Sequence, residues 1–257
     1  GELIVTAQRG PLADTVRVRI EAGDQRAVLM EDWSAGIAPR WIPFGAPRPS
    51  IAAGPGGRLG MLNGGDSSYP SGVYSRLSWN ASAGLGAEVL ISAMITRDKW
   101  QLASVGLMAG LDTAALGSWD HLTGSLPYRP SVAHLLSCGA QYPANDGMGR
   151  EATLAAGGSN NTAQVPVLPS LGDGRWFRLR IQVFPDGTCG VAVEGQPRWR
   201  SRLSVQLVGP MAVVLQGNSH RSPILVGPVE VWEGVRGDVP WNLLADSRPL
   251  ADSGRKH

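Results

Sequence analysis

Two glutamates could supply the acid and base of a hydrolase. Glu88 begins one alternating apolar segment and Glu194 ends another, so both are expected on strands. Hydrolysis of a glycosidic bond needs two carboxyl groups about 5–9.5 Å apart in a cleft. Glu230 and Glu233 cannot form such a pair, because a spacing of three on a strand directs the side chains to opposite faces. A Glu88–Glu194 pair across strands is therefore one hypothesis for chemistry in this chain.

Arginines form a second pattern, because they alternate with other residues along three expected strands. The three sets are Arg17/Arg19, Arg178/Arg180 and Arg198/Arg200/Arg202. If these strands were neighbours, a basic ladder could bind an acidic glycan, a lipid headgroup or a protein surface. The solvated outer face of a β-sandwich would carry the same pattern, and that interpretation is favoured.

A third candidate is a group of mostly aromatic residues outside the expected strands. Exposed loops carry binding residues more often than the scaffold does, and aromatic side chains stack on ligands. The ligand-binding candidates are Trp119, Asp120, His121, Tyr128 and Tyr142. A surface loop packed by its own Trp119 would look the same.

Metal and cysteine chemistry is sparse. The turn around Asp66 offers oxygen ligands for calcium, but a single carboxylate is too few without distant partners, and a cap of its own turn by Asp66 is the favoured interpretation. Cys138 and Cys189 are the only cysteines, and they form either one disulfide or two buried thiols. His134, in an apolar run, and His220, in a tight loop, are expected to be structural. No metalloprotease, phosphate-loop or nucleophile-elbow motif occurs, so we expect no cofactor.

Composition restricts the class of protein. The 257 residues include 23 basic and 21 acidic side chains, and this balance gives no case for nucleic-acid binding. A hydrophobic content of 43% with 17% charged residues indicates a folded chain. No apolar run approaches the ~18 residues of a membrane helix, so we expect no membrane span. No signal-peptide pattern follows Gly1, which leaves a removed signal or anchor open.

Period-2 alternation predicts strands nearly everywhere a pattern can be counted. In 176–184, Phe177, Leu179, Ile181 and Val183 are expected to point inward, and Arg178, Arg180 and Gln182 outward. The other expected strands are 15–20, 27–33, 49–53, 58–62, 72–79, 88–96, 100–108, 188–194, 199–207, 211–215 and 224–232. Residues 139–174 are read as loop-rich, and 111–116 as a short helical turn. We expect one domain over 10–240 and a polar tail over 241–257.

The order of motifs resembles a known family. The motifs are Glu31-Asp-Trp33, Trp41-Ile-Pro-Phe-Gly45, Gly64-Gly-Asp66, Ser71-Gly-Val-Tyr-Ser75, Trp100-Gln101, Gly174–Arg180, Asp186-Gly187, Glu194-Gly195 and Gly227–Glu233. They resemble concanavalin A-like lectin/glucanase domains of the laminin G type over about residues 27–234. The resemblance implies an all-β jelly-roll sandwich of two antiparallel sheets. In bacteria such domains are often attached to membrane-anchored or secreted proteins, and a bacterial source is expected because arginine greatly outnumbers lysine, as in proteins from GC-rich genomes.

The chain departs from the family's catalytic and metal-binding patterns. Hydrolases of the family carry Glu-x-Asp-x-x-Glu on a strand, and legume-type lectins carry an acidic metal-binding strand; neither sequence occurs here. We therefore expect a non-catalytic binding or recognition domain outside the cytoplasm, with a carbohydrate or a protein as ligand. The alternative is an accessory subunit held by protein–protein contacts in a larger assembly, such as a membrane complex. A glycoside hydrolase ranks third.

Overall fold

Strands make up all the regular secondary structure in the described part of the chain. The computed structural model describes residues 2–9, 12–19, 25–45, 48–52, 58–61, 71–94, 101–109, 136–144, 151–156, 162–166, 173–204, 209–219, 224–236 and 241–243. Within these ranges no helix occurs, and so none that could cross a membrane.

Eighteen strands are described, and they fall into three groups. The first is a hairpin of β1 (Glu2–Arg9) and β2 (Leu12–Arg19). The second is a seven-stranded sheet of β4 (Trp41–Phe44), β7 (Ser71–Trp79), β9 (Gln101–Ala109), β10 (Leu136–Ala144), β11 (Glu151–Ala156), β12 (Thr162–Pro166) and β16 (Met211–Ser219). The third is a nine-stranded sheet of β3 (Arg26–Glu31), β5 (Ser50–Ile51), β6 (Leu59–Met61), β8 (Leu85–Met94), β13 (Asp173–Val183), β14 (Thr188–Val193), β15 (Trp199–Ser204), β17 (Ile224–Glu233) and β18 (Asn242–Leu243).

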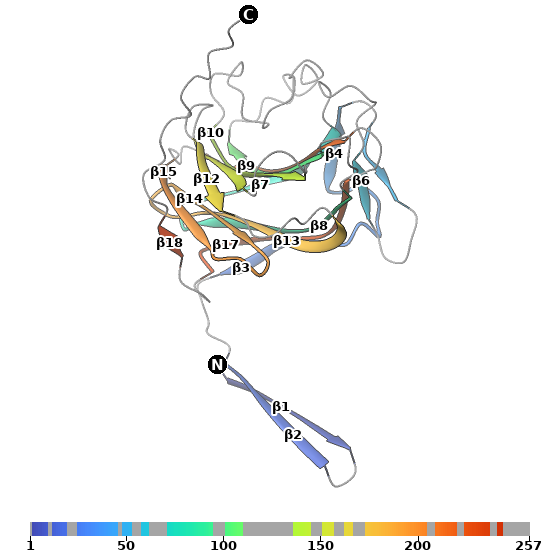
Figure 1. Ribbon diagram of the computed structural model, residues 1–257, viewed down its shortest axis with the longest axis vertical. Coiled ribbons are helices and arrows are strands. Elements are labelled where there is room, and N and C mark those ends of the chain that lie inside the picture. The colour runs from blue at the N-terminus through green and yellow to red at the C-terminus, as the bar shows by residue number, and fades with distance from the viewer. Residues whose placement is uncertain are drawn as a thin grey trace, which may run out of the picture.

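The two large sheets stack face to face as a β-sandwich, and the β1–β2 hairpin lies apart from both (Figure 1). The seven-stranded sheet has the order β12-β11-β10-β9-β16-β7-β4. The nine-stranded sheet has the order β18-β15-β14-β13-β8-β17-β6-β5, and β3 also pairs with β17. The described pairings are antiparallel except for β15 with β18, which is parallel. The predicted all-β sandwich of antiparallel sheets is confirmed.

The core lies between the sheets and follows the alternation of the strands. In β13 the four residues predicted to point inward, Phe177, Leu179, Ile181 and Val183, are all buried in the apolar core. Corresponding residues on β8, β14 and β17 join them, and β9 and β16 supply the facing layer. A period of two thus places the apolar residues on the inner faces and sends the charged residues to the outer faces.

Gln182 shows that an outward residue need not reach solvent. Its side chain lies on the outer face, as predicted, but is fully buried. The amide nitrogen donates to the carbonyl oxygens of Val183 and Gly234, and the amide oxygen accepts from the Trp232 indole. Trp232 is itself buried on this face, so part of the nine-stranded sheet has a second apolar layer outside it.

The strand predictions were incomplete in one segment and at both ends. Residues 139–174 were expected to be loops, but they contain the end of β10 and all of β11 and β12. β11 and β12 are short and have few large apolar residues, so pairing with neighbours rather than pattern creates them. β2 lies in the hairpin, and β18, within the expected tail, joins the nine-stranded sheet. The strands of the sandwich therefore run from β3 to β18. The expectation of one domain over residues 10–240 stays a prediction.

The predicted turn between β13 and β14 is present. Asp186 accepts hydrogen bonds from the backbone and hydroxyl of Thr188, and its carboxylate also pairs with Arg200 of β15. Gly187 has a φ of 79°, a conformation that glycine adopts at little cost. Burial alone would raise the pKa of Asp186, but the Thr188 hydrogen bonds and Arg200 outweigh it and lower that pKa.

A buried carboxylate ties the two sheets together at one end. Glu31 ends β3, and its side chain is 2% exposed. One oxygen accepts from the backbone N–H of Asp32 at 3.0 Å and of Trp33 at 2.8 Å, and the other accepts from the Trp41 indole of β4 at 3.0 Å. The hydrogen bonds hold Trp33 at a φ of 63°, which is rare for a bulky residue. Its indole donates to the Gly227 carbonyl oxygen and packs against the Trp41 ring.

The cysteines belong to different sheets. Cys189 of β14 is buried in the core and is disulfide-bonded. The chain has one other cysteine, Cys138, on β10 of the opposite sheet, and no described cysteine is free. Since β10 and β14 approach each other across the sandwich, the bond ties the two sheets together.

Replacing Glu31 with alanine should strongly destabilise the sandwich. The variant leaves the Trp33 N–H and the Trp41 indole N–H buried without an acceptor, so we expect a loss of about 2–5 kcal/mol in the free energy of unfolding. The control is Glu233→Ala, which removes an exposed pair with Arg26 and should cost at most about 1 kcal/mol. Denaturant unfolding of both variants measures the difference, and equal losses would contradict the proposed role of Glu31.

The β13–β14 turn should give stability a dependence on acidic pH. Because folding lowers the pKa of Asp186, its contribution is complete above the unfolded value of about 4 and disappears as the pH falls through the folded value. The stability difference between the parent and Asp186→Asn should therefore shrink on acidification from about pH 7 to about pH 2. Denaturant unfolding over that range tests this, and a difference that widens in acid would refute it.

Candidate functional site

Most of the predicted loop site lies outside the described residues. This holds for Trp119, Asp120, His121 and Tyr128, and equally for Asp66, His134 and His220. Tyr142 was expected in a loop, but it lies in β10 opposite Ala103 of β9, because β10 extends as far as Ala144. No group of three or more His, Cys, Asp or Glu side chains that could hold a metal occurs in the described ranges. The aromatic ligand site and the Asp66 calcium site remain predictions.

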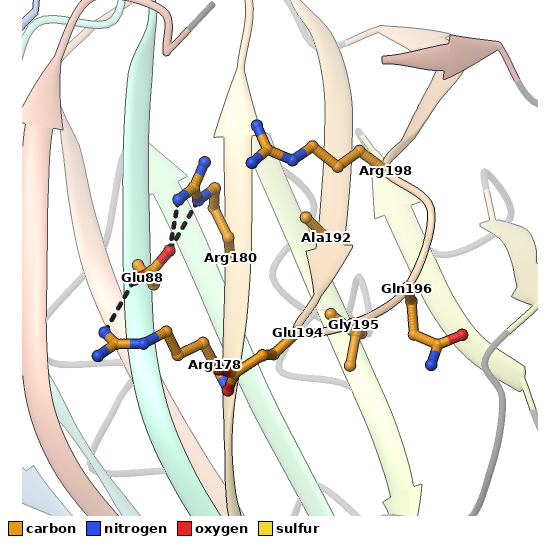
Figure 2. Close-up of a pocket in the computed structure, with 9 residues that line it drawn as sticks. Glu88, Arg178, Arg180, Ala192, Glu194, Gly195, Gln196 and Arg198 are labelled. Carbon is orange, nitrogen blue, oxygen red and sulfur yellow. Dashed lines mark hydrogen bonds and ion pairs between the residues drawn. The ribbon is translucent and has the colours of Figure 1, made fainter. Parts of the chain in front are cut away.

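Charged side chains instead gather around a pocket on the outer face of the nine-stranded sheet (Figure 2). The pocket has a volume of about 230 Å³. Its lining comes from β8, β13, the end of β14 and the turn that follows it. The lining residues are Glu88, Arg178, Arg180, Ala192, Val193, Glu194, Gly195, Gln196 and Arg198.

Strand register places the central residues of this pocket in one row. Glu88 of β8 lies opposite Arg180 of β13, and Arg180 lies opposite Ala192 of β14 on its other side. Directly opposite residues in a sheet share a face, so all three point outward together. Arg178, two residues from Arg180, lies on the same face. The row brings together residues that are about 100 positions apart in the sequence.

The hollow exists because β14 contributes small side chains between two strands that carry arginines. Gly190 and Ala192 are the two small outward residues of β14. The Trp241 ring covers Gly190 so closely that a Cβ there would collide with it. Ala192 is left as the floor of the pocket, with Arg180 on one side and Arg198 on the other (Figure 2). The sequence shows that Gly190 and Ala192 are small. They indicate a pocket only when the neighbouring strands β13 and β15 are known, because the larger side chains on and next to those strands form its walls.

Two guanidinium groups hold the Glu88 carboxylate. Arg180 contacts one carboxylate oxygen through Nε at 2.8 Å and Nη2 at 2.7 Å, and Arg178 contacts the other oxygen through Nη1 at 3.1 Å. The side chains of Glu88 and Arg180 are 10% and 12% exposed, whereas that of Arg178 is 56% exposed. Both carboxylate oxygens of Glu88 are therefore in ion pairs, and more than half of the Arg178 side chain is exposed to solvent.

Glu194 and the turn after it form the opposite rim. One carboxylate oxygen of Glu194 accepts from the Arg178 backbone N–H at 3.1 Å, and the Glu194 N–H donates to the Arg178 carbonyl oxygen. Gly195 has a φ of 73°, and the Gln196 N–H closes the turn on the Val193 carbonyl oxygen. The turn places a carboxylate and an amide side chain at the mouth of the pocket.

The predicted arginine ladder is not continuous. Arg17 and Arg19 lie in the β1–β2 hairpin, away from the sheet that carries Arg178 and Arg180. β15 is separated from β13 by β14, and its Arg200 turns to Asp186 and to the Phe184 ring, 3.9 Å away. Strand order, which the pattern does not contain, brings Arg198 to the same pocket as Arg178 and Arg180 but leaves Arg17, Arg19 and Arg200 apart from them.

The hypothesis of a Glu88–Glu194 pair is met in one respect and not in another. Both residues line the same pocket, Glu88 on β8 at one side of β13 and Glu194 directly after β14 at the other. Glu88, however, has arginine contacts to both oxygens, so neither oxygen is positioned to protonate a leaving group or to activate water.

A second cavity of about 380 Å³ lies between β3 and β7. Its lining is mainly apolar and includes Met30 and Leu77, whose exposed fractions of 62% and 64% are large for such residues. Arg40 and Arg76 also line it. This cavity has the character of a protein contact surface more than that of a polar ligand site.

Comparison with known proteins identifies the fold. No family model matches the chain, and no curated protein matches its sequence. Among solved structures, a Bacillus subtilis protein of unknown function with a galectin-like fold has a TM-score of 0.57 at 13% identity, over 82% of this chain and 97% of that one. The Emp46p carbohydrate recognition domain has a TM-score of 0.53 at 10% identity, over 76% and 89%.

A β-glucanase of Bacillus licheniformis is similar to the same degree, with a TM-score of 0.53 at 11% identity over 81% of this chain and 98% of that one. At these identities the likeness shows the fold alone. The chain has a concanavalin A-like lectin/glucanase β-sandwich, as the resemblance of its motifs predicted.

The Gly86→Ala variant tests the packing that supports Arg180. Trp232 lies directly over Gly86, and the Arg180 guanidinium lies 5.5 Å from the centre of the Trp232 ring. An added Cβ must displace this indole, so we expect a loss of about 1–3 kcal/mol in thermal unfolding experiments. In the control variant, Gly209→Ala, the Cβ meets open space and stability should change by no more than about 1 kcal/mol. Equal stability of the two variants would contradict the close packing of Trp232 on Gly86.

Proposed function

We propose that this chain is a non-catalytic carbohydrate-recognition domain, and that the outer-face pocket binds one sugar unit. The observation that supports this proposal most is the mixture of hydrogen-bond donors and acceptors around Ala192, the small residue at the floor of the pocket. Arginine side chains donate hydrogen bonds, the Glu194 carboxylate accepts them, and the Gln196 amide does both. Sugar hydroxyls are donors and acceptors at once, so they require such a mixture.

The size of the pocket supports a single sugar unit. Drug-sized ligands occupy cavities of about 300–1,000 Å³, and this pocket has about 230 Å³. The remainder of an oligosaccharide would extend over the surrounding sheet face. The predicted loop residues Trp119, Asp120, His121 and Tyr128 are a second candidate contact for such a chain.

A binding role is preferred to hydrolysis because of the state of Glu88. A glycosidase needs one carboxyl group that can donate a proton and one carboxylate that can accept one. Glu88 is enclosed by Arg178 and Arg180, and the Glu194 carboxylate accepts a backbone hydrogen bond. Both carboxylates thus serve to build the pocket.

A location outside the cytoplasm is part of the proposal. The disulfide at Cys189 supports it, because structural disulfides persist in oxidising compartments. The second candidate function is an accessory subunit held by protein contacts. The apolar cavity at Met30 and Leu77 favours that alternative, since large exposed apolar side chains often mark interfaces.

A glycan array probed with the whole chain tests the proposal, with calcium and again with chelator. We expect binding that Ala192→Leu abolishes, because the larger side chain fills the floor of the pocket, and that Leu77→Ala leaves intact. No release of reducing ends from the bound glycan is expected. Loss of binding with chelator would support the calcium site near Asp66.

A folded chain that binds no glycan on the array would refute the proposal and leave the accessory-subunit role. Measurable hydrolysis that Glu88→Gln abolishes would refute the non-catalytic part. Thermal unfolding of each variant shows whether a loss of binding reflects the pocket or a loss of fold.

A further inference from the structure

We infer that the apolar cavity between β3 and β7 binds an extended, acidic segment of a partner protein. The cavity shares no lining residue with the outer-face pocket, so this inference does not depend on sugar binding. The apolar rim of the cavity, the strand edges beside it and its charge each support the inference.

The rim of the cavity is apolar and exposed. Met30 of β3 and Leu77 of β7 line the cavity together, and they are 62% and 64% exposed. The inner wall includes Val28 and Leu29, which pack against the core, and Trp79, which belongs to it. Large apolar side chains grouped on a surface mark a place that another molecule covers. The volume of about 380 Å³ is within the range of ligand sites, about 300–1,000 Å³, so side chains of a partner can enter the cavity.

Both strands that line the cavity have a stretch of edge without a partner strand in the described part of the chain. β3 pairs with β17 alone, and its Met30 carbonyl oxygen accepts a hydrogen bond from the Arg40 side chain. β4 pairs with residues 72–75 of β7, so the end of β7 at 77–79 extends beyond β4. Unpaired strand edges accept extended peptides through backbone hydrogen bonds. We therefore expect the bound segment to be extended.

The cavity also carries a positive charge that no described carboxylate balances. Its described lining contains Arg40 and Arg76 but neither Asp nor Glu. Arg40 lies 3.7 Å from the buried carboxylate of Glu31 and also interacts electrostatically with Asp32. Arg76 is exposed, and its Nε donates to the Ala38 carbonyl oxygen at 2.9 Å, but its side chain has no ion pair within the described ranges. The two Nη groups of Arg76 can therefore bind a carboxylate of the partner.

This charge favours a different protein over a second copy of the chain. In a two-fold contact the same surface meets itself, so the Arg76 side chains of both copies would lie in one interface and repel each other. A segment that carries a carboxylate beside large apolar side chains complements both Arg76 and the apolar rim.

A phage-displayed library of random heptapeptides, selected on the whole chain, tests the inference. The selection is repeated on a Met30→Ser, Leu77→Ser double variant, which removes the apolar rim and identifies peptides that bind elsewhere. We expect the peptides specific to the parent to combine large apolar residues with Asp or Glu. The most enriched peptide is then synthesised, and its binding to the parent is measured by fluorescence anisotropy.

Two pairs of variants connect the binding to the cavity. Leu77→Ala should weaken binding of the peptide about tenfold, whereas Ile51→Ala, at an exposed apolar residue of β5 outside the cavity, should not. Arg76→Gln should also weaken it about tenfold, whereas Arg48→Gln, at an exposed arginine outside the cavity, should not. Once the acid of the peptide is replaced by its amide, Arg76→Gln should have no effect. Thermal unfolding checks that each variant is folded.

Three results would overturn the inference. If no peptide is enriched on the parent relative to the double variant, the docking site is refuted. If the enriched peptides lack an acidic residue, or if Arg76→Gln binds them as the parent does, the acidic partner is refuted. If the chain sediments as a dimer that Leu77→Ala dissociates, a second copy occupies the cavity instead. The glycan array tests the outer-face pocket separately, so a failure of one proposal is distinguishable from a failure of the other.

Discussion

Burial of the inner faces of β8, β13 and β14 is the constraint on which the candidate site depends. Val89, Leu179 and Val193 lie next to one another across these strands and are all in the core. Their burial sets the register, and the neighbouring residues on the outer face follow from it. A slip of one residue in any of the three strands would exchange the two faces and dismantle the row of Glu88, Arg180 and Ala192.

Buried polar groups connect parts of the sandwich by hydrogen bonds. Glu31 connects the end of β3 to Trp41 of the opposite sheet, and Gln182 connects Trp232 to the backbone at Gly234. Each has several hydrogen-bond partners, which is the condition under which a buried polar group is tolerated. On the outer face, the guanidinium groups of Arg180 and Arg236 both lie close to the Trp232 ring. The sheet that carries the pocket therefore has packed side chains on both of its faces.

A carbohydrate recognition domain and a β-glucanase have similar folds, so the architecture alone does not distinguish binding from hydrolysis. The distinction depends on what each carboxylate contacts. Glu88 is surrounded by guanidinium groups, and Glu194 anchors a turn. Both carboxylates are therefore in contact with neighbouring groups of the pocket. The same carboxylates in a cleft without arginines would have the freedom that proton transfer requires.

The sequence by itself determined the local features of this protein. Alternation in 176–184 predicted which residues face the core, and Pro185-Asp186-Gly187 predicted the turn, because both depend on neighbours along the chain. Only the tertiary structure placed β8 beside β13 and inserted β14 between the arginines of β13 and β15. The physical reason is that every alternating strand presents a similar apolar face, so local pattern does not specify neighbours. Pairing between distant strands does, and it assembled Glu88, Arg180 and Ala192 into a pocket.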